Sequence, residues 1–570
     1  MNKLFFFILL HALVIQGIAA PKKLPEAVEV TFQMVVNGKT RPDGAKTKLL
    51  CSPLASRSWT ENNSKTLLPT VAKETSCIDF NAQKTYQLAR FSDGKTIHTP
   101  LAFSEYPVLT ETNETALIQG YKCHKLTTSL RSNAIEIWYT TELGVKGTPA
   151  MAYGIPDGLV LKIVRNGNYE ILASEVKLLK KNTESIIPAE LGESMDASLY
   201  KHRITENLIT TVNVFSNEQI SFGNEIINPS DTESEKTFKY SSGTVILKKV
   251  KLPKVADDTQ LFVELYQHSA GDAYDRTGSV FMIPQDKERS FLEGLRNGTA
   301  SLPSFKARNE KSYQGVVATG NFTPLVEIMR FFTSFGIGQF NDKVSVYGQQ
   351  WEDSTLYKQD VTELLPLLQG ECWIGVFIGN YDKGGHRASL KLKYYPGSME
   401  VTEKPARKYW VAPLFNTLNV MEMSGQEYGT MFENDSLQVE VTIPEGVKNI
   451  QMRYITTGHG GWGGGDEFNQ KMNTILLDGN TLFQFTPWRT DCATYRQYNP
   501  ASGNFWNGVT SSDYSRSGWC PGTLTNPVFF PITTITPGKH KISVSIPLGK
   551  NEGGSFSAWN VSGILLGEYE

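Results

Sequence analysis

The sequence has no excess of charge of either sign, because 56 lysine and arginine residues stand against 58 aspartate and glutamate residues. This balance leaves no electrostatic footprint for nucleic acid or for an anionic membrane, and neither is expected as a partner. No internal repeat of about 20–50 residues and no low-complexity tract is present, which disfavours solenoids and propellers. Helical periodicity is also rare, although residues 360–370, "DVTELLPLLQG", form one window that predicts a helix.

Cysteine is scarce, and no two cysteines form a CxxC pair, which excludes zinc-ribbon and thioredoxin-like sites. In an oxidising compartment disulfides are the default state of such cysteines. Cys492 and Cys520 bracket a loop rich in Gly, Asn, Ser and Tyr, where a crosslink would contribute about 3–4 kcal/mol. Cys51 with Cys77 is a weaker alternative pair, and the remaining two cysteines are expected to be unpaired.

Segments that alternate apolar and polar residues dominate the chain; examples are "EAVEVTFQMVV", "AIEIWYTTEL", "SLKLKYY" and "KISVSIPL". Alternation of this kind, rich in β-branched and aromatic residues and interrupted by Gly, Pro and Asn, predicts antiparallel strands with one face in water. The fold class is therefore all-β, with several sandwiches.

The chain of 570 residues is too long for one core, and composition divides it into five parts. Residues 1–20 read as a secretory signal peptide with an apolar stretch short of the about 20 residues that span a bilayer. The protein is therefore expected to be exported, either to the periplasm or outside the cell. A β domain follows at 21–185, then a polar linker without a clear strand at 186–207, and then two further β units at 208–400 and 401–570.

The glycine-rich stretch "GHGGWGGGDEF" from Gly458 to Phe468 ends in two adjacent carboxylates, Asp466 and Glu467. A phosphate loop is disfavoured because no phosphate-binding motif is present and the carboxylates would repel the ligand. A metal site through His459 stays open, although the acidic residues do not alternate as in calcium loops. The third interpretation is an ordinary hairpin loop with a solvated Asp-Glu pair.

Two other clusters combine charged and aromatic side chains on loops. The first, "AGDAYDRTG", is a turn that contains Asp272, Asp275 and Arg276. It suits carbohydrate binding, because aromatic faces stack on sugars. The alternative is an ordinary exposed Asp–Arg turn. In "YSRSGWCPG", Arg516 and Trp519 lie beside a cysteine, either as a rigid binding surface or with the tryptophan buried on a disulfide.

Together and in this order, "GDAYDR", "GDEFNQKMNTILLDGN" and "YSRSGWCPG" resemble three motifs of the bacterial peptide:N-glycosidase F family, over about residues 208–570. The resemblance implies two adjacent eight-stranded jelly-roll sandwiches with an active site at their interface. It implies that Asp275 and Glu467 are catalytic and that Cys492 and Cys520 form a disulfide; Asp466 is expected to be a bystander. The substrate-binding residues that it implies are Tyr274, Arg276, His459, Phe468, Arg516 and Trp519.

The sequence departs from the family pattern at several positions. Two of the family's disulfides are missing, and His459 replaces a tryptophan. A third family glutamate would fall near Gly379 and Asn380, where this chain has no acidic residue. Residues 21–185 carry a separate resemblance, through "GYKCHKL" and "GIPDGLVL", to the GLPGLI family of exported β-sheet proteins.

The reaction that the resemblance implies is amide hydrolysis: cleavage of the bond between an asparagine side chain and the first N-acetylglucosamine of an N-glycan. N-glycosylated proteins or peptides are then the partners, no cofactor or metal is needed, and a monomer is expected. A non-catalytic N-glycan-binding protein is the alternative, favoured by the missing glutamate. A copper-dependent oxygenase is disfavoured, because the eight histidines form no recognisable ligand set.

Overall fold

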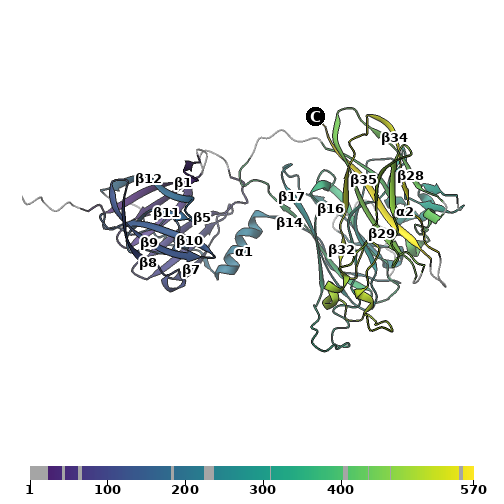
Figure 1. The fold of residues 1–570 in the computed structure, drawn as a ribbon, viewed down its shortest axis with the longest axis horizontal. Helices are drawn as coiled ribbons and strands as arrows, with labels where there is room; N and C mark the ends of the chain where they lie inside the picture. Colours follow the sequence, from purple (N-terminus) through teal and green to yellow (C-terminus); the bar gives the residue numbers. More distant parts are fainter. Residues whose placement is uncertain are drawn as a thin grey trace, which may run out of the picture. The chain divides into compact units, whose positions relative to one another are not determined.

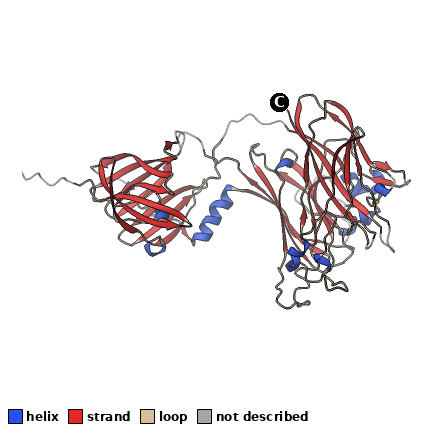
Figure 2. Ribbon diagram, in the orientation of Figure 1, coloured by secondary structure: helices blue, strands red, loops and turns tan. Residues whose placement is uncertain are grey.

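A computed structural model describes residues 24–41, 45–61, 67–180, 185–223, 236–308, 310–401, 409–433, 435–461, 464–550 and 556–569. The chain forms two compact units, residues 1–208 with 399–401 and the remainder of residues 209–570 (Figure 1). Strands dominate both units (Figure 2). The predicted signal peptide lies outside the described residues. Within the described ranges, no helix is both long and apolar enough to cross a membrane.

The first unit is built on one curved sheet of thirteen strands, in which β1 lies between β3 and β12. Alternating residues of β1, among them Val28, Val30 and Phe32, are buried against the core, as its sequence pattern predicts. The strands are β1 (Ala27–Val36), β2 (Lys39–Thr40), β3 (Lys46–Cys51), β4 (Ala55–Glu61), β5 (Lys73–Asp79), β6 (Lys84–Arg90), β7 (Thr96–Ala102), β8 (Thr110–Ile118), β9 (Tyr121–Leu130), β10 (Asn133–Thr140), β11 (Leu159–Arg165), β12 (Tyr169–Leu179) and β13 (Glu193–Ser194).

The stretch predicted as a linker, 186–207, is structured and belongs to this first unit. It contains strand β13, which pairs in parallel with β7, and helix α1 (Ala197–Leu208). The Asp196 carboxylate accepts hydrogen bonds from the first backbone N–H groups of the helix, and Tyr200 packs against Ala89 and Ile97. The linker prediction is therefore contradicted, because strand pairing, a helix cap and the packing of Met195, Tyr200 and Ile204 dock this mostly polar stretch.

The second unit begins with a sandwich whose two sheets have the strand orders β14-β26-β17-β24 and β15-β16-β25-β18-β23-β32. Side chains such as Val263 and Leu390 from the first sheet pack against Ile246 and Val376 from the second. The strands are β14 (Thr210–Ile220), β15 (Phe238–Tyr240), β16 (Val245–Leu252), β17 (Gln260–Ser269), β18 (Thr277–Ile283), β23 (Val326–Phe332), β24 (Thr355–Asp360), β25 (Gly370–Ile378), β26 (His386–Tyr395) and β32 (Leu524–Thr525); the short elements β19 (Arg289–Ser290), α2 (Phe291–Asn297), β20 (Ser304–Lys306), β21 (Ser312–Gln314) and β22 (Phe322–Thr323) lie between β18 and β23.

A second sandwich has two four-stranded sheets with the orders β27-β35-β29-β33 and β28-β34-β30-β31. Tyr454 and Leu565 from one sheet meet Ile475 and Val544 from the other in its core. The strands are β27 (Tyr409–Asn416), β28 (Leu437–Ile443), β29 (Val447–His459), β30 (Asn473–Leu477), β31 (Asn480–Phe485), β33 (Val528–Pro531), β34 (Gly538–Ser545) and β35 (Ala558–Tyr569). The fold prediction of adjacent β-sandwiches with a separate β domain before them is confirmed. The second sandwich has the predicted eight strands, whereas the first has ten and takes in β32 from the later part of the chain.

The two sandwiches are joined by a buried network of charged groups. Arg330 on β23 forms an ion pair with Glu327, at 2.7 Å, and both side chains are fully buried. The same guanidinium donates to the Asn560 carbonyl on β35, and Ser562 on β35 donates to Glu327 at 2.7 Å. Arg453 on β29 donates to the Glu327 carbonyl at 2.9 Å. These bonds cross from one sandwich to the other, so the network fixes the junction at which the candidate site is built.

The predicted helix at residues 360–370 is wrong. The structure has only a 3-10 turn, η5 (Thr362–Leu364), before the chain enters β25. Pro366 has no N–H to donate and clashes with the preceding turn, so the helix does not propagate. Leu364, Leu365 and Leu368 are nevertheless buried in the core of the first sandwich, which accounts for the apolar spacing.

Candidate active site

The first candidate carboxylate, Asp275, is carried by a tight turn between β17 and β18. The Ser269 hydroxyl bonds to the Asp272 carbonyl at 2.6 Å and accepts the Gly271 N–H, which closes the start of the turn. Thr333, beyond the end of β23, accepts the Arg276 N–H at 2.7 Å through its hydroxyl. The turn is therefore fixed on both sides by the first sandwich, and Asp275 projects from a rigid support.

The neighbouring acid, Asp272, stabilises this turn. Its buried carboxylate accepts two hydrogen bonds from Arg276, the shorter at 2.7 Å, and lies 3.4 Å from the imidazole of His386. Burial opposes ionisation of Asp272, but the nearby His386 and the hydrogen bonds and charge of Arg276 outweigh it and lower the pKa to about 2. Asp272 is therefore ionised at any physiological pH and fixes the Arg276 side chain through two hydrogen bonds.

The second candidate carboxylate, Glu467, ends the glycine-rich loop after β29. Two close approaches explain the glycines: an added Cβ on Gly465 would lie 1.5 Å from the Gly461 oxygen, and one on Gly458 would lie 2.7 Å from the ring of Trp559. The Ser517 N–H donates to the Glu467 carbonyl at 3.0 Å. The loop thus packs directly against the chain that carries Arg516. Trp462 and Gly463 of this loop lie outside the described residues.

Asp466, expected to be a bystander, anchors the loop. Its buried carboxylate accepts the indole N–H of Trp559 at 2.6 Å and the Gly549 N–H at 2.9 Å. Burial raises the pKa of Asp466, which fits a structural group rather than a solvated one. The expectation of a solvated Asp-Glu pair is therefore wrong, because Asp466 points inward while Glu467 points to the site.

Arg516 brings the two candidate carboxylates together. Its Nε lies 3.2 Å from Glu467 Oε1 and its Nη2 lies 3.4 Å from Asp275 Oδ2. The Arg516 side chain is 1% exposed, whereas the side chains of Asp275 and Glu467 keep 15% and 22% exposure. Asp275 lies 241 positions before Arg516 in the chain, and Glu467 lies 49 positions before it, yet both contact one guanidinium and stay open to a substrate.

The two carboxyl groups, Asp275 and Glu467, differ in pKa. Burial raises the pKa of Asp275 to about 6, against the lowering effect of the nearby Arg516. Burial also raises the pKa of Glu467, to about 8; Arg516 opposes this rise, and the negative charge of Asp275 adds to it. Near neutral pH, Asp275 is therefore the ionised member of the pair and Glu467 the protonated one, which is the arrangement that acid–base chemistry requires.

Arg516 is itself held by aromatic rings. The guanidinium carbon lies 4.7 Å from the Trp519 ring and 5.0 Å from the Phe468 ring. The Trp519 ring also stacks on Phe332, with ring centroids 4.2 Å apart. His459 packs against both of these rings and bonds to the Thr457 hydroxyl at 2.9 Å; burial lowers its pKa to about 3, so the imidazole is neutral.

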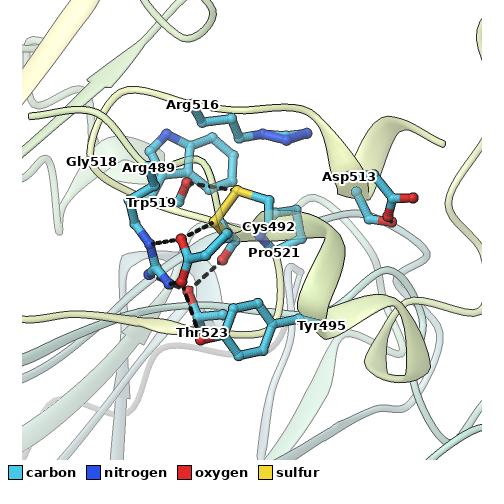
Figure 3. Close-up of a disulfide and its surroundings, with 12 residues drawn as sticks. Arg489, Cys492, Tyr495, Asp513, Arg516, Gly518, Trp519, Pro521 and Thr523 are labelled. Atoms are coloured by element: carbon cyan, nitrogen blue, oxygen red, sulfur yellow. Dashed lines mark hydrogen bonds and ion pairs between the residues drawn. A yellow bond between two sulfur atoms is a disulfide. The ribbon is translucent and has the colours of Figure 1, made fainter. Parts of the chain in front are cut away.

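A disulfide between Cys492 and Cys520 ties down the segment that carries Arg516, and this predicted bond is confirmed (Figure 3). Figure 3 shows Arg516 and Trp519 on the chain that leads into the bridge. Trp519 is 3% exposed and donates its indole N–H to the Gly458 carbonyl at 3.1 Å. Trp519 thus supports Arg516 and offers no free stacking face, which agrees with the alternative of a tryptophan buried beside a disulfide.

The alternative pair of Cys51 and Cys77 is wrong, since both thiols are free. The other two cysteines, Cys123 and Cys372, are also free, as expected. Burial raises the pKa of all four thiols, to about 11 for Cys77. These cysteines are therefore protonated and unreactive at neutral pH.

The remaining predicted residues, Tyr274 and Arg276, form the rim beside Asp275. The Arg276 guanidinium lies 5.0 Å from the Tyr274 ring and 5.4 Å from the ring of Tyr381. Tyr274 is 60% and Tyr381 is 54% exposed, so both rings are available to a ligand. Tyr381 was not among the predicted site residues; it lies two positions after Gly379, and no motif marked it.

A pocket of about 610 Å³ opens next to Phe468, the residue that follows Glu467. Trp506, on its wall, is 98% exposed. Exposed aromatics in a pocket with an amide and hydroxyl groups are typical of carbohydrate binding. This pocket was not predicted from the sequence; it is lined by Phe468, Asn469, Trp488, Phe505, Trp506, Tyr514 and Ser515.

In the described part of the chain, no group of three or more His, Cys, Asp or Glu side chains is placed to hold a metal ion. A metal site in the glycine-rich loop is disfavoured as well, because its proposed ligands are engaged elsewhere: His459 bonds to Thr457, and Asp466 bonds to Trp559. The geometry instead brings together two carboxyl groups and one guanidinium.

Two joined β-sandwiches with a carboxylate pair bridged by arginine define a β-sandwich protein equipped for general acid–base chemistry. Comparison with known families gives matches to peptide-N-glycosidase F, N terminal, over residues 211–394, and to its C-terminal counterpart over residues 427–566. Residues 30–202 match the N-glycanase peptide, N-terminal domain. The chain belongs to the peptide-N-glycosidase F family. The resemblance of the first unit to the GLPGLI family stays a prediction.

Two crystal forms of one relative, PNGF-II, agree with this assignment. PNGF-II, in its P21 crystal form, is 44% identical over 96% of this chain and 100% of its own, with a TM-score of 0.87. Its C2 crystal form gives 44% identity over 95% and 98%, with a TM-score of 0.80. PNGase F, a glycosylasparaginase from Flavobacterium meningosepticum, is 14% identical over 63% of this chain and 96% of its own, with a TM-score of 0.41. No curated protein matches the chain.

Proposed function

We propose that this protein is an amidase that hydrolyses the side-chain amide of a glycosylated asparagine and releases the intact N-glycan. The observation that carries the proposal is the pair of partly exposed carboxyl groups, Asp275 and Glu467, on one buried arginine. Membership of the peptide-N-glycosidase F family supports an N-glycan as the substrate.

In the proposed reaction, Asp275 takes a proton from a water molecule, whose oxygen forms a bond to the amide carbon. The Arg516 guanidinium offsets the negative charge that develops on the carbonyl oxygen in this partly dry site. Glu467, protonated near neutral pH, gives its proton to the amide nitrogen as the carbon–nitrogen bond breaks. The products are an aspartate side chain and a glycosylamine, and no metal or cofactor takes part.

A glycopeptide assay tests the proposal. The protein is incubated with an N-glycopeptide, and the peptide is examined by mass spectrometry for conversion of the glycosylated asparagine to aspartate. We expect this conversion together with a released glycan that retains both inner N-acetylglucosamine residues. Cleavage between those two residues, or no conversion at all, would contradict the proposed reaction.

The alternative is a non-catalytic N-glycan-binding protein, and the aromatic pocket beside Phe468 and the bare Gly379 favour it. The same assay separates the two functions, because a binding protein would retain the glycopeptide without changing its mass.

Export to the periplasm or outside the cell is also part of the proposal. The apolar N-terminal segment supports export, and detection of a shortened mature N-terminus after secretion would test it.

A further inference from the structure

A carboxylate that the sequence motifs do not identify lies over a bare glycine beside the candidate active site. Glu422 begins the 3-10 turn η6 (Glu422–Ser424), which follows β27, and Gly379 follows β25 directly. A Cβ added to Gly379 would lie 3.5 Å from Glu422 Oε2. The Glu422 carboxylate therefore occupies the space into which a side chain at position 379 would extend.

This space adjoins the turn that carries Asp275. The Gly379 N–H donates to the carbonyl of Thr277 at 3.0 Å, and Thr277 is only two residues beyond Asp275. The ring of Tyr381 lies against the Arg276 guanidinium, and the Tyr381 hydroxyl donates to Glu422 Oε1. A continuous set of contacts thus links Glu422 to the residue next to Asp275.

The Glu422 carboxylate accepts hydrogen bonds at only one of its two oxygens. Oε1 accepts hydrogen bonds from the hydroxyls of both Tyr381 and Tyr428. The Tyr428 ring is itself fixed by Phe556, with centroids 4.8 Å apart. Among the described residues, none hydrogen-bonds to Oε2, and the Glu422 side chain is only half-buried. Such a group is preorganised to accept a hydrogen bond from a ligand.

The surroundings favour a sugar as this ligand. Tyr274 and Tyr381 present exposed rings on the same rim, and aromatic faces stack on the apolar faces of sugars. The hydroxyl and acetamido N–H groups of an N-acetylated sugar are donors, which need acceptors such as a carboxylate oxygen. We propose that Glu422 is a substrate-positioning residue that accepts a hydrogen bond from a hydroxyl or acetamido N–H of the sugar attached to asparagine. This inference rests on the proposed function.

The geometry also implies that a glutamate at position 379 could supply the same carboxylate as Glu422. Gly379 has no left-handed φ, and the nearest obstacle to a Cβ there, besides Glu422, is the ring edge of Phe377 at 3.1 Å, which needs only a small shift. A glutamate placed at 379, with Glu422 cut back to alanine, would bring its carboxylate to the same space from the other side. A purely structural role for Glu422 gives no reason to expect such a rescue.

The test compares Glu422→Gln, Glu422→Ala and the double variant Gly379→Glu/Glu422→Ala, with Glu433→Gln as a control at an exposed carboxylate on the same segment. Release of glycan from a glycopeptide and binding of N,N'-diacetylchitobiose, measured by calorimetry, are the two readouts. For both single variants at position 422 we expect kcat/KM and chitobiose affinity to fall about 10- to 100-fold, the loss of one charge-assisted hydrogen bond. The double variant should recover most of this loss, and Glu433→Gln should equal the wild type.

Unchanged kcat/KM and chitobiose affinity in Glu422→Gln would overturn the inference. A loss that is not recovered, in a double variant that melts at the wild-type temperature, would also overturn it, because Glu422 would then be acting through structure alone. Chitobiose binding needs no turnover. A wild-type protein that binds chitobiose through Glu422 but releases no glycan would therefore disprove the proposed amidase while leaving this inference standing.

Discussion

The two units of the molecule differ in whether they bury charged side chains. Among the described residues, every aspartate, glutamate and arginine that is buried lies in the second unit, including Asp272, Glu327, Arg330, Asp466 and Arg516. The buried polar side chains of the first unit are serines, threonines and His98. Because an unpaired buried charge is costly, its presence requires a compensating network. The second unit retains such networks where its two sandwiches meet, and the candidate site is built on them, whereas the first unit is held by apolar packing across one sheet.

The largest expected effect follows from the network at the junction. Arg330→Met removes the guanidinium and leaves Glu327 buried without its ion-pair partner. We expect a loss of about 3–5 kcal/mol in the free energy of unfolding of the second unit, measured by urea denaturation. The double variant Arg330→Met/Glu327→Leu should regain part of that loss; a single variant as stable as the wild type would show that the network does not hold the sandwiches together.

The matching change in the first unit is the truncation of a core side chain. Ile137 on β10 is fully buried, and Ile137→Ala should destabilise its unit by about 2–5 kcal/mol through lost burial and a residual cavity. At a temperature where both units stay folded, glycan release from a short glycopeptide should be unchanged. Calorimetry should show one shifted transition and one unshifted; a common shift of both would contradict the division into two separate units.

The acidity of the carboxyl pair predicts a bell-shaped pH dependence of kcat/KM. Burial raises the pKa of Asp275, so activity should fall as the pH drops through about 6 and the base becomes protonated. Burial raises the pKa of Glu467 as well, so activity should fall again as the pH rises through about 8 and the acid loses its proton. Glu467→Gln should abolish the alkaline limb; a profile that is flat between pH 5 and pH 9, an interval of about one unit beyond each limb, would refute these roles.

The smallest effect is expected in the aromatic pocket. Trp506 is almost fully exposed, so Trp506→Ala should leave the melting temperature unchanged. If the pocket receives outer sugars of the glycan, KM for a glycopeptide with a long glycan should rise about 2- to 10-fold, as expected for one lost stacking contact. A glycopeptide that carries chitobiose alone should show no change; an equal change for both substrates would place Trp506 next to the reacting bond.

Much of the fold follows from the sequence, because strand alternation in segments such as β1 and β26 is set by which side chains must leave water. Asp275, Glu467 and Arg516 could also be predicted to share one site, because each stands in a short motif that resembles one of the family's motifs. Glu422 could not, because its place beside Gly379 depends on contacts between segments that no local pattern encodes. The same is true of Asp466, whose role depends on Trp559, 93 residues away along the chain.

The central claim is that Asp275 and Glu467 hydrolyse the glycosylated asparagine amide. The most direct test is glycan release from one defined glycopeptide by the wild type, Asp275→Asn and Glu467→Gln, with chitobiose binding and melting temperature measured in parallel. We expect Asp275→Asn to lower kcat by about 10²- to 10⁴-fold while the protein stays folded and still binds chitobiose. An Asp275→Asn variant that converts asparagine to aspartate at the wild-type rate would contradict the claim.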